Sequence, residues 1–260
     1  MKPFLKILFL AMVLTATAHA QDLPAWKKNA VAVTIPVHAA KIVIIIDDMG
    51  EDRVHTKQIT ELPGPLTLSY LPYPEHVAEE VAAGRKAGHE IMVHMPMEPM
   101  HADLETGDYF LTTEEPADEF MAHLNKNLAA FDGYVGVNNH MGSRLTTDRK
   151  SMDMVMAELH TRGLLFVDSR TVSASVAAES AAAHGLPQIS RDVFLDDVPT
   201  IDAVRHQLSE VERVARRQGH AVAIGHPKAA TIDALKEWLP TLKDKGFVLV
   251  PVSAVVNTGS

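Results

Sequence analysis

The chain has 260 residues, a formal net charge of -9 and no cysteine. The lack of cysteine excludes disulfides and thiolate metal sites, which leaves histidine and carboxylate side chains as ligands for a bound metal. The acidic balance argues against a nucleic-acid or anionic-membrane surface, because both would need clustered lysine and arginine. A hydrophobic content of 47% over this length favours one globular domain.

Residues 1–20 have the features of a secretory signal peptide. Lys2 and Lys6 provide the positive start, residues 5–14 form a short apolar run, and Ala20 ends a small-residue cleavage site. The apolar run has about half of the ~20 residues that a membrane-spanning helix needs. We therefore predict cleavage rather than a stable membrane anchor, and a periplasmic or secreted mature protein.

Residues 21–40 form an N-terminal leader to which the sequence assigns no function. From Lys41 onward, short apolar runs alternate with helical patterns, which is typical of a parallel sheet built from βα units. The predicted strands are 42–47, 65–71, 90–95, 134–139, 164–168, 188–195, 220–225 and 247–252. Seven or eight such units favour a barrel over an open sheet, so residues 41–256 are predicted to form a single α/β barrel domain.

The segment before the seventh predicted strand shows the helical pattern most clearly. Val204, Leu208, Val211 and Ala215 fall at helical spacing and predict a helix with one apolar face. Gly219 follows this stripe, at the position where a left-handed residue ends a helix and turns the chain back. The pattern therefore predicts a helix that covers the sheet.

Polar side chains follow most of the predicted strands at their carboxyl ends, where parallel α/β folds build their sites. These residues are, in chain order, Asp47, Asp48, His94, Glu98, Asn138, Asn139, His140, Asp168 and His226. A single aspartate in such a place is more often a turn or capping residue, and Asp168 taken alone has that interpretation. Asp47 and Asp48 differ, because two adjacent carboxylates repel each other unless a cation or a proton separates them.

Two or three imidazoles near two carboxylates would fit a divalent cation with an open coordination position. Such an ion lowers the pKa of a water molecule and makes it a usable nucleophile. The alternative is a hydrogen-bonded polar cluster without metal. Spacing alone leaves both alternatives open, because the residues come from different strands.

Four segments of the chain resemble the divergent polysaccharide deacetylase family, and the resemblance covers nearly all of residues 41–256. The segments are Ile45-Ile46-Asp47-Asp48-Met49-Gly50, Gly88-His89-Glu90-Ile91-Met92-Val93-His94-Met95-Pro96-Met97-Glu98-Pro99, Val137-Asn138-Asn139-His140-Met141-Gly142-Ser143 and Ala223-Ile224-Gly225-His226-Pro227. That family is similar in turn to the metal-dependent carbohydrate deacetylases. The resemblance therefore implies the distorted (β/α) barrel of those enzymes and metal-dependent removal of acetyl groups.

The resemblance implies a role for each of several residues. Asp47 takes the position of the catalytic base, and Asp48 takes that of a metal ligand. His94 matches the first histidine of the metal-binding segment, and His226 matches the late histidine that protonates the leaving amine. Glu98 stands where the second metal-binding histidine would be.

His140, at the end of the fourth predicted strand, is the other candidate for the missing imidazole. We predict Asp48, His94 and His140 as ligands of a divalent metal ion, with zinc as the expected ion. Glu98 is then a further ligand or a partner that holds an imidazole in position.

The family's arginine and Pro-Tyr segment is replaced here by Asn138-Asn139-His140-Met141, so its substrate contacts cannot be transferred. The candidates for substrate-binding or supporting roles are Glu98, Asn139, Arg144 and Asp168. Arg144, Arg191 and Asp196 are further substitutes for the missing contacts. A surface salt bridge is the preferred interpretation for each of these three.

The implied reaction is removal of acetyl groups from an N-acetylated cell-wall or extracellular polysaccharide, with Asp47 as base and His226 as acid. A glycosidase that uses Asp47 and Asp196 is a second interpretation, which leaves the three histidines without a role. A third is a non-catalytic cell-envelope binding protein on a deacetylase scaffold. Tyr73 and Tyr109 are far apart in the sequence and are interpreted as packing residues. The oligomeric state is not predicted.

Overall fold

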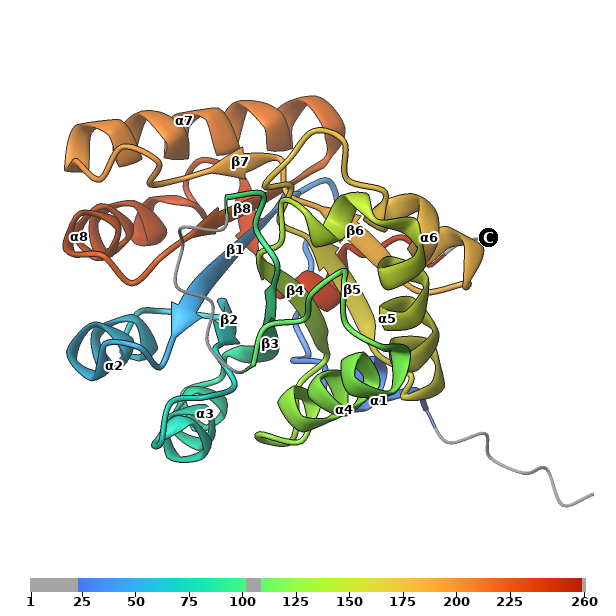
Figure 1. The fold of residues 1–260 in the computed structure, drawn as a ribbon. Helices are drawn as coiled ribbons and strands as arrows, with labels where there is room; N and C mark the ends of the chain where they lie inside the picture. Colours follow the sequence, from blue (N-terminus) through green and yellow to red (C-terminus); the bar gives the residue numbers. More distant parts are fainter. Residues whose placement is uncertain (1–22, 102–108, 259–260) are drawn as a thin grey trace, which may run out of the picture.

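The computed structural model describes residues 23–101 and 109–258 (Figure 1). The predicted signal peptide lies outside the described residues. The strands of the described part are β1 (Ala40–Met49), β2 (Thr67–Tyr70), β3 (Glu90–Met97), β4 (Gly136–Met141), β5 (Leu165–Asp168), β6 (Gln188–Ser190), β7 (Val193–Phe194), β8 (His220–Gly225) and β9 (Phe247–Leu249). Each predicted strand range overlaps at least one of these strands.

Helices connect the strands and cover the outside of the sheet (Figure 1). They are α1 (Ala25–Lys28), α2 (Arg53–Thr60), α3 (Val77–Lys86), α4 (Ala117–Leu128), α5 (Arg149–Thr161), α6 (Ala177–Ala183), α7 (Ile201–Gln218) and α8 (Ala229–Trp238). Short 3-10 turns are η1 (Leu145–Thr147), η2 (Leu239–Thr241) and η3 (Val252–Ala254).

The strand pairs are parallel, and the order in the sheet is β6-β5-β4-β3-β2-β1-β8-β7, with β9 beside the start of β1. The two ends of this order, β6 and β7, are joined in the chain by Arg191 and Asp192 alone. The Arg191 N–H donates to the Asp168 carbonyl at 3.0 Å, and the next N–H, of Asp192, donates to the Val222 carbonyl at 2.8 Å. The range predicted as one strand, 188–195, is therefore two short strands, one at each end of the curled sheet. The predicted distorted single-domain barrel is confirmed.

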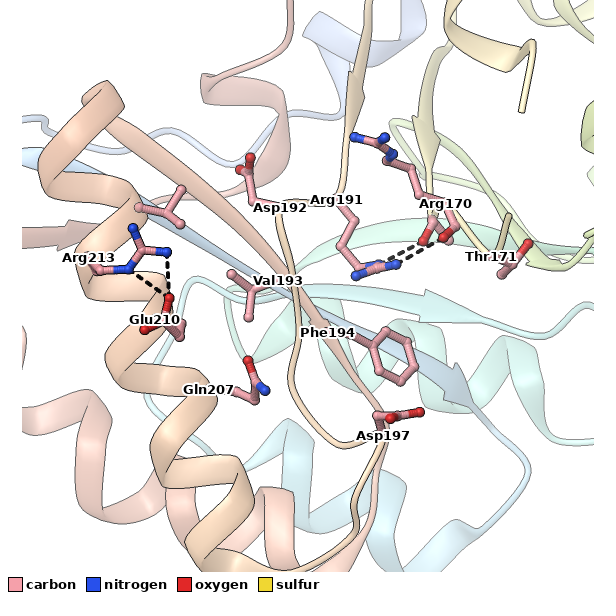
Figure 2. Close-up of a pocket in the computed structure, with 12 residues that line it drawn as sticks. Arg170, Thr171, Arg191, Asp192, Val193, Phe194, Asp197, Gln207, Glu210 and Arg213 are labelled. Atoms are coloured by element: carbon pink, nitrogen blue, oxygen red, sulfur yellow. Dashed lines mark hydrogen bonds and ion pairs between the residues drawn. The ribbon is translucent and has the colours of Figure 1, made fainter. Parts of the chain in front are cut away.

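A cavity of about 620 Å³ lies beside this junction, between the loop after β5, strand β7 and helix α7 (Figure 2). We call it the seam cavity. Its wall includes Arg191 from the junction, Phe194 from β7 and Gln207 from α7. At the junction the chain leaves β5, the neighbour of β6, and joins β8, the neighbour of β7. Polar side chains of the junction therefore line a cavity near the carboxyl ends of the strands.

The central strand β1 is buried on both faces, as expected for a parallel strand that has helices on one side and the barrel interior on the other. Ile42 and Ile46 belong to the large apolar cluster that the helices share. Val43 and Ile45 belong to the smaller cluster that fills the barrel. Because side chains alternate along a strand, Asp47 continues the row of Val43 and Ile45 toward the interior.

Helix α7 begins and ends where its sequence predicts. The Thr200 hydroxyl accepts a hydrogen bond from the Ala203 N–H at the N-terminus, and Gly219 has a left-handed φ of 83° at the C-terminus. The four residues of the predicted apolar stripe are all buried: Val204, Leu208, Val211 and Ala215. Their burial anchors α7 to the outside of the barrel.

The described part of the predicted leader packs against the end of the barrel where the strands begin. The Trp26 N–H donates to the Gly163 carbonyl at 2.9 Å. Glu90, the first residue of β3, is buried and accepts hydrogen bonds from the backbone N–H and the hydroxyl of Ser253. The carboxylate thus holds the C-terminal residues at this end, away from the opposite end, where β1, β3 and β4 finish. Among the described helices, none has both the length and the apolar character needed to cross a bilayer.

Candidate active site

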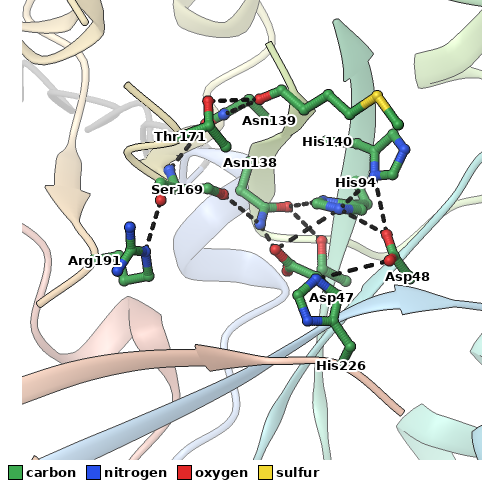
Figure 3. Close-up of polar contacts among 12 residues, drawn as sticks. Asp47, Asp48, His94, Asn138, Asn139, His140, Ser169, Thr171, Arg191 and His226 are labelled. Carbon is green, nitrogen blue, oxygen red and sulfur yellow. Dashed lines mark hydrogen bonds and ion pairs between the residues drawn. The ribbon is translucent and has the colours of Figure 1, made fainter. Parts of the chain in front are cut away.

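The side chains of Asp48, His94 and His140 meet at the carboxyl ends of β1, β3 and β4 (Figure 3). Oδ1 of Asp48 lies 3.2 Å from Nε2 of His94 and 3.0 Å from Nδ1 of His140. The two ring nitrogens are 3.1 Å apart. These are the three residues that the sequence singles out as metal ligands, and the structure brings one donor atom from each into a single triangle.

The triangle has the dimensions of a metal site. Metal–ligand bonds of ~2.0–2.2 Å at ordinary bond angles separate neighbouring donor atoms by ~3.0–3.6 Å. Oδ1 of Asp48 is buried and has no hydrogen bond of proper geometry, although two ring nitrogens lie close to it. An unsatisfied buried carboxylate oxygen is costly, and a cation would satisfy it. Two imidazoles and a carboxylate suit zinc or a similar divalent ion.

The backbone of Asp48 explains how its side chain reaches this triangle. Asp48 has a left-handed φ of 52°, which is unusual for a residue other than glycine. The pairing of β1 with β2 shifts register between Ile46 and Met49, as in a β-bulge. The shift turns Asp48 away from the outward direction that strand alternation would give it. Strain of this kind is characteristic of functional sites.

The charges of the triangle are strongly coupled in the ion-free protein. Burial acts to raise the pKa of Asp48, but the His140 and His94 rings hold it well below its usual value. Burial acts to lower the pKa of His94, but the carboxylates of Asp47 and Asp48 outweigh it and raise that pKa to about 9. A proton on His94 therefore balances the carboxylates when no metal ion is bound.

Asp47 lies beside the triangle and is itself buried. Its Oδ2 is 3.7 Å from Nε2 of His94, and its Oδ1 accepts a hydrogen bond from the side-chain amide of Asn138 at 2.8 Å. Burial raises the pKa of Asp47, and the charges of His94 and His226 oppose this effect. One oxygen is thus fixed by an amide, while the other faces the site.

Asn138 positions two groups at once. Its Oδ1 lies 3.0 Å from Nδ1 of His94 and also accepts a hydrogen bond from the Ser69 hydroxyl. When Nδ1 of His94 donates to this oxygen, Nε2 is left without a proton and can bind a metal ion. From the sequence, Asn138 is a polar residue at a strand end and part of a motif, with no role of its own. Its spacing of two from His140 on β4, which puts both on one face, is the signal that could have identified it.

His226 follows β8 on the other side of Asp48. Its Nε2 is 3.7 Å from Oδ2 of Asp48, and its Nδ1 is 2.8 Å from Oδ1 of Asp196. Burial acts to lower the pKa of His226, but Asp196 outweighs it and the pKa is raised. The Asp196 carboxylate therefore favours the protonated imidazole with Nε2–H directed at the site.

Asp196 is fully buried, so its interpretation as a surface salt bridge is wrong. Its Oδ2 accepts hydrogen bonds from the His226 N–H and the Thr231 hydroxyl, each at 2.7 Å. With Oδ1 on the imidazole, both oxygens are engaged. Burial acts to raise the pKa of Asp196, but its bonds to His226 and Thr231 lower it. This arrangement does not supply a free acid for a glycosidase that would pair Asp196 with Asp47.

Glu98 is not part of the triangle. Its Oε2 accepts hydrogen bonds from the N–H and hydroxyl of Thr113 at 2.7 and 2.8 Å, and its Oε1 pairs with Arg144 at 2.8 Å. Glu98 is therefore neither a fourth member of the donor-atom triangle nor a hydrogen-bond partner of one of its imidazoles. Arg144 is half-exposed and also pairs with Glu114 at 2.9 Å, which agrees with a surface ion pair.

Asn139 and Asp168 hold loops rather than facing the triangle. Oδ1 of Asn139 accepts from the Ser169 N–H at 2.9 Å, which ties the end of β4 to the end of β5. Asp168 accepts from the Arg170 N–H and from the Ser175 hydroxyl, both at 2.8 Å. Both residues therefore shape the loop that borders the site and the seam cavity.

Two tyrosines from different loops pack against each other. The rings of Tyr73 and Tyr109 have centroids 5.7 Å apart, and Lys126 lies over Tyr109 at 4.4 Å. Burial raises the pKa of Tyr73 to about 12, with the charges of Glu51 and Asp48 adding to the effect. The interpretation of these tyrosines as scattered packing residues missed a partly exposed aromatic pair on the Asp48 side of the site.

The sequence profile described as divergent polysaccharide deacetylase matches residues 44–256. The uncharacterized protein YibQ of Escherichia coli (strain K12) is 34% identical over 227 residues, which cover 87% of this chain and 70% of YibQ. The crystal structure of uncharacterized protein ATU2773 from Agrobacterium tumefaciens C58 is 26% identical with a TM-score of 0.87, over 90% of this chain and 96% of that one.

A more distant likeness concerns the fold alone. The catalytic domain of peptidoglycan N-acetylglucosamine deacetylase from Eubacterium rectale ATCC 33656 is 14% identical with a TM-score of 0.53, over 88% of this chain and 96% of that domain. The profile match spans most of the chain and includes every residue of the triangle as well as Asp47 and His226. The chain therefore belongs to the divergent polysaccharide deacetylase family.

Proposed function

We propose that the protein is a metal-dependent hydrolase that removes acetyl groups from an N-acetylated polysaccharide. One observation carries the proposal. Asp47 and His226 flank the donor-atom triangle, and each is oriented by its own buried partner, Asn138 for Asp47 and Asp196 for His226. A buried polar cluster that served only stability would not need a base and an acid on either side of an unsatisfied carboxylate oxygen.

Asp48, His94 and His140 would hold the ion, and zinc suits the two imidazoles and one carboxylate. When bound, a divalent ion supplies Lewis acidity and lowers the pKa of water. Asn138 keeps its bond to the Nδ1–H of His94, so that Nε2 faces the ion. These residues therefore bind and orient, while proton transfer belongs to Asp47 and His226.

Asp47 accepts a proton from the attacking water at Oδ2, the oxygen that Asn138 leaves free. His226 gives a proton from Nε2 to the departing amine as the carbon–nitrogen bond of the acetamide breaks. Asp196 stabilises the imidazolium before that transfer through its bond to Nδ1. One water is consumed, and acetate and a free amino sugar are released.

The cell envelope is the proposed place of action, with a polysaccharide as partner. The signal-like residues 1–20 support export to the periplasm or the exterior. The negative charge of the protein is compatible with a glycan rather than a nucleic acid as ligand. Tyr73 and Tyr109 offer aromatic faces on which a sugar ring could pack beside Asp48.

The test is metal content followed by acetate release. The protein is stripped of metal, reloaded with zinc and incubated with N-acetylglucosamine oligomers and with peptidoglycan. We expect about one zinc per chain, acetate release by the zinc-loaded protein and none by the stripped protein. Zinc-loaded protein that releases no acetate from any of these glycans would contradict the proposal and favour a binding protein on this scaffold.

A further inference from the structure

Two arginines line the seam cavity without a carboxylate partner. Among residues 23–101 and 109–258, the arginines that form ion pairs do not include Arg170 or Arg191. Instead, the Arg191 guanidinium donates to the backbone carbonyls of Ser169 and Arg170 at 2.7 and 3.0 Å (Figure 2). These bonds fix the plane of the guanidinium, and no carboxylate of the described residues forms a direct ion pair with it.

The acidic residues of the cavity are largely engaged elsewhere. Glu210 pairs with Arg213 at 2.6 Å. The carboxylate of Asp192 accepts from the Gln218 side chain and from the Val222 N–H, both at 2.9 Å. Asp197 is the remaining acid of the lining. The donors to Asp192 are uncharged, so Asp192 and Asp197 both lack an ion-pair partner among the described residues, as Arg170 and Arg191 do. The oxygens of Asp192, however, are already held by hydrogen bonds.

The cavity adjoins the proposed reacting centre through one aromatic ring. Phe194 has its centroid 5.0 Å from the guanidinium carbon of Arg191 and 5.4 Å from the centroid of His226. Ser169 forms a second link, since its hydroxyl accepts from Asn138 at 3.2 Å while its carbonyl accepts from Arg191. A polymer that places one sugar at His226 can therefore place its neighbour in the cavity.

Arg170 is exposed and lines the seam cavity from the loop after β5. Arg170 has a left-handed φ of 50°. The side chain of Asp168 stabilises this conformation by accepting a hydrogen bond from the Arg170 N–H. Burial lowers the pKa of Arg191 and the charge of Arg170 lowers it further, while the charges of Asp168, Asp47 and Asp192 oppose the shift. A bound anion would relieve this repulsion.

We propose that the seam cavity binds an anionic group, a carboxylate or a phosphate, on the sugar next to the acetylated one. This inference rests on the proposed deacetylase function for the identity of the neighbouring sugar. Nε and Nη2 of Arg191 already donate to carbonyls, so the donors offered to an oxyanion are Nη1 of Arg191 and the guanidinium of Arg170, and the half-burial of Arg191 strengthens the attraction. The preferred substrate is then an acidic polysaccharide rather than a neutral one such as an N-acetylglucosamine polymer.

Binding of two oligosaccharides of equal length tests the inference by calorimetry. One alternates N-acetylglucosamine with glucuronic acid, and the other contains N-acetylglucosamine alone. The zinc-loaded full chain carries Asp47→Asn so that neither ligand is consumed. We expect at least about tenfold tighter binding of the acidic oligosaccharide, the size of one good charge-assisted contact.

Variants of the cavity make the test specific. Arg170→Gln and Arg191→Lys should each reduce the preference several-fold, the second because lysine keeps the charge but loses the fork. Arg205→Gln is the matched control and should keep the preference, because Arg205 lies on α7 outside the cavity lining and is paired with Glu237. Free glucuronate and inorganic phosphate, added as competitors, distinguish the two anions by which one displaces the acidic oligosaccharide.

Equal binding of the two oligosaccharides, no binding of the acidic one, or a preference that survives both Arg170→Gln and Arg191→Lys would overturn the inference. The outcome is separable from that of the proposed function. Acetate release without a preference contradicts the anion site alone. A preference that needs Arg170 and Arg191, in a protein that releases no acetate, contradicts the hydrolase alone.

Discussion

Asp47 and Asp48 present their carboxylates to the same ring nitrogen, Nε2 of His94, at 3.7 and 3.2 Å. Consecutive side chains of a strand ordinarily point to opposite faces of the sheet. Here the register shift after Ile46 and the left-handed φ of Asp48 turn the second carboxylate back toward the first. One short segment of β1 thus supplies both a candidate base and a candidate metal ligand.

The first prediction separates these two carboxylates. Asp47→Asn keeps the shape but cannot accept a proton, so turnover should fall by roughly 10²–10⁴-fold. Zinc content should be unchanged, because Asp48, His94 and His140 remain. Steady-state acetate release and elemental analysis measure the two effects. Asp52→Asn, at the exposed N-cap of α2, is the control and should keep full activity.

If Asp47→Asn keeps most of the wild-type rate, Asp47 is a turn residue and the proposed base is wrong. Loss of both zinc and activity would instead make Asp47 part of the ligand set.

The second prediction concerns the pH dependence of metal affinity. His94 has a pKa raised to about 9 in the ion-free protein and must lose its proton to bind a metal ion. Zinc affinity should therefore rise by about tenfold per pH unit as pH increases from neutral toward that pKa. Competition with a coloured chelator at several pH values measures the slope. An affinity that does not change over this range would show that His94 carries no proton in the ion-free protein and would contradict its raised pKa.

The third prediction tests Asp196 as a positioning residue. His226 acts in its protonated form, so activity should fall as pH rises through the His226 pKa. The Asp196 carboxylate raises that pKa, and Asp196→Asn removes the charge while keeping the shape. The alkaline fall in kcat should therefore begin at lower pH in Asp196→Asn.

If Asp196 is merely structural, Asp196→Asn would lower kcat or stability without changing the pH at which kcat falls on the alkaline side. The pH profile of kcat, measured alongside thermal unfolding, distinguishes the two. If the alkaline fall in kcat occurs at the same pH in Asp196→Asn and in the wild type, Asp196 does not raise the pKa of the proposed acid, His226.

The fourth prediction concerns the close approach of β4 and β5. A Cβ added at Gly136 would overlap the backbone carbonyl of Leu165, its partner in the parallel ladder. Because a backbone atom cannot rotate away, Gly136→Ala should lower the free energy of unfolding by roughly 1–3 kcal/mol. It should also weaken zinc binding, because β4 carries Asn138 and His140. Urea unfolding and zinc titration check both effects, and wild-type values for both would show that β4 shifts freely.

The sequence by itself determined the barrel and the location of the site. Apolar runs bounded by glycine fixed the alternation of strands and helices, because local periodicity decides which face of each element is buried. In a parallel barrel the carboxyl ends of all strands share one edge, so Asp48, His94 and His140 could be expected to meet.

Only the tertiary structure decided which partners these residues have. Glu98 occupies the motif position of a ligand, yet its carboxylate is bonded to Thr113 and Arg144. Asp196 was expected at the surface, yet it is bonded to the imidazole of His226. The Asp196–His226 contact spans 30 positions, and the Asp47–Asn138 contact spans 91. Such contacts depend on the register between strands and on single backbone angles, such as φ of Asp48, which are set by the packing of the whole barrel rather than by any local pattern of residues.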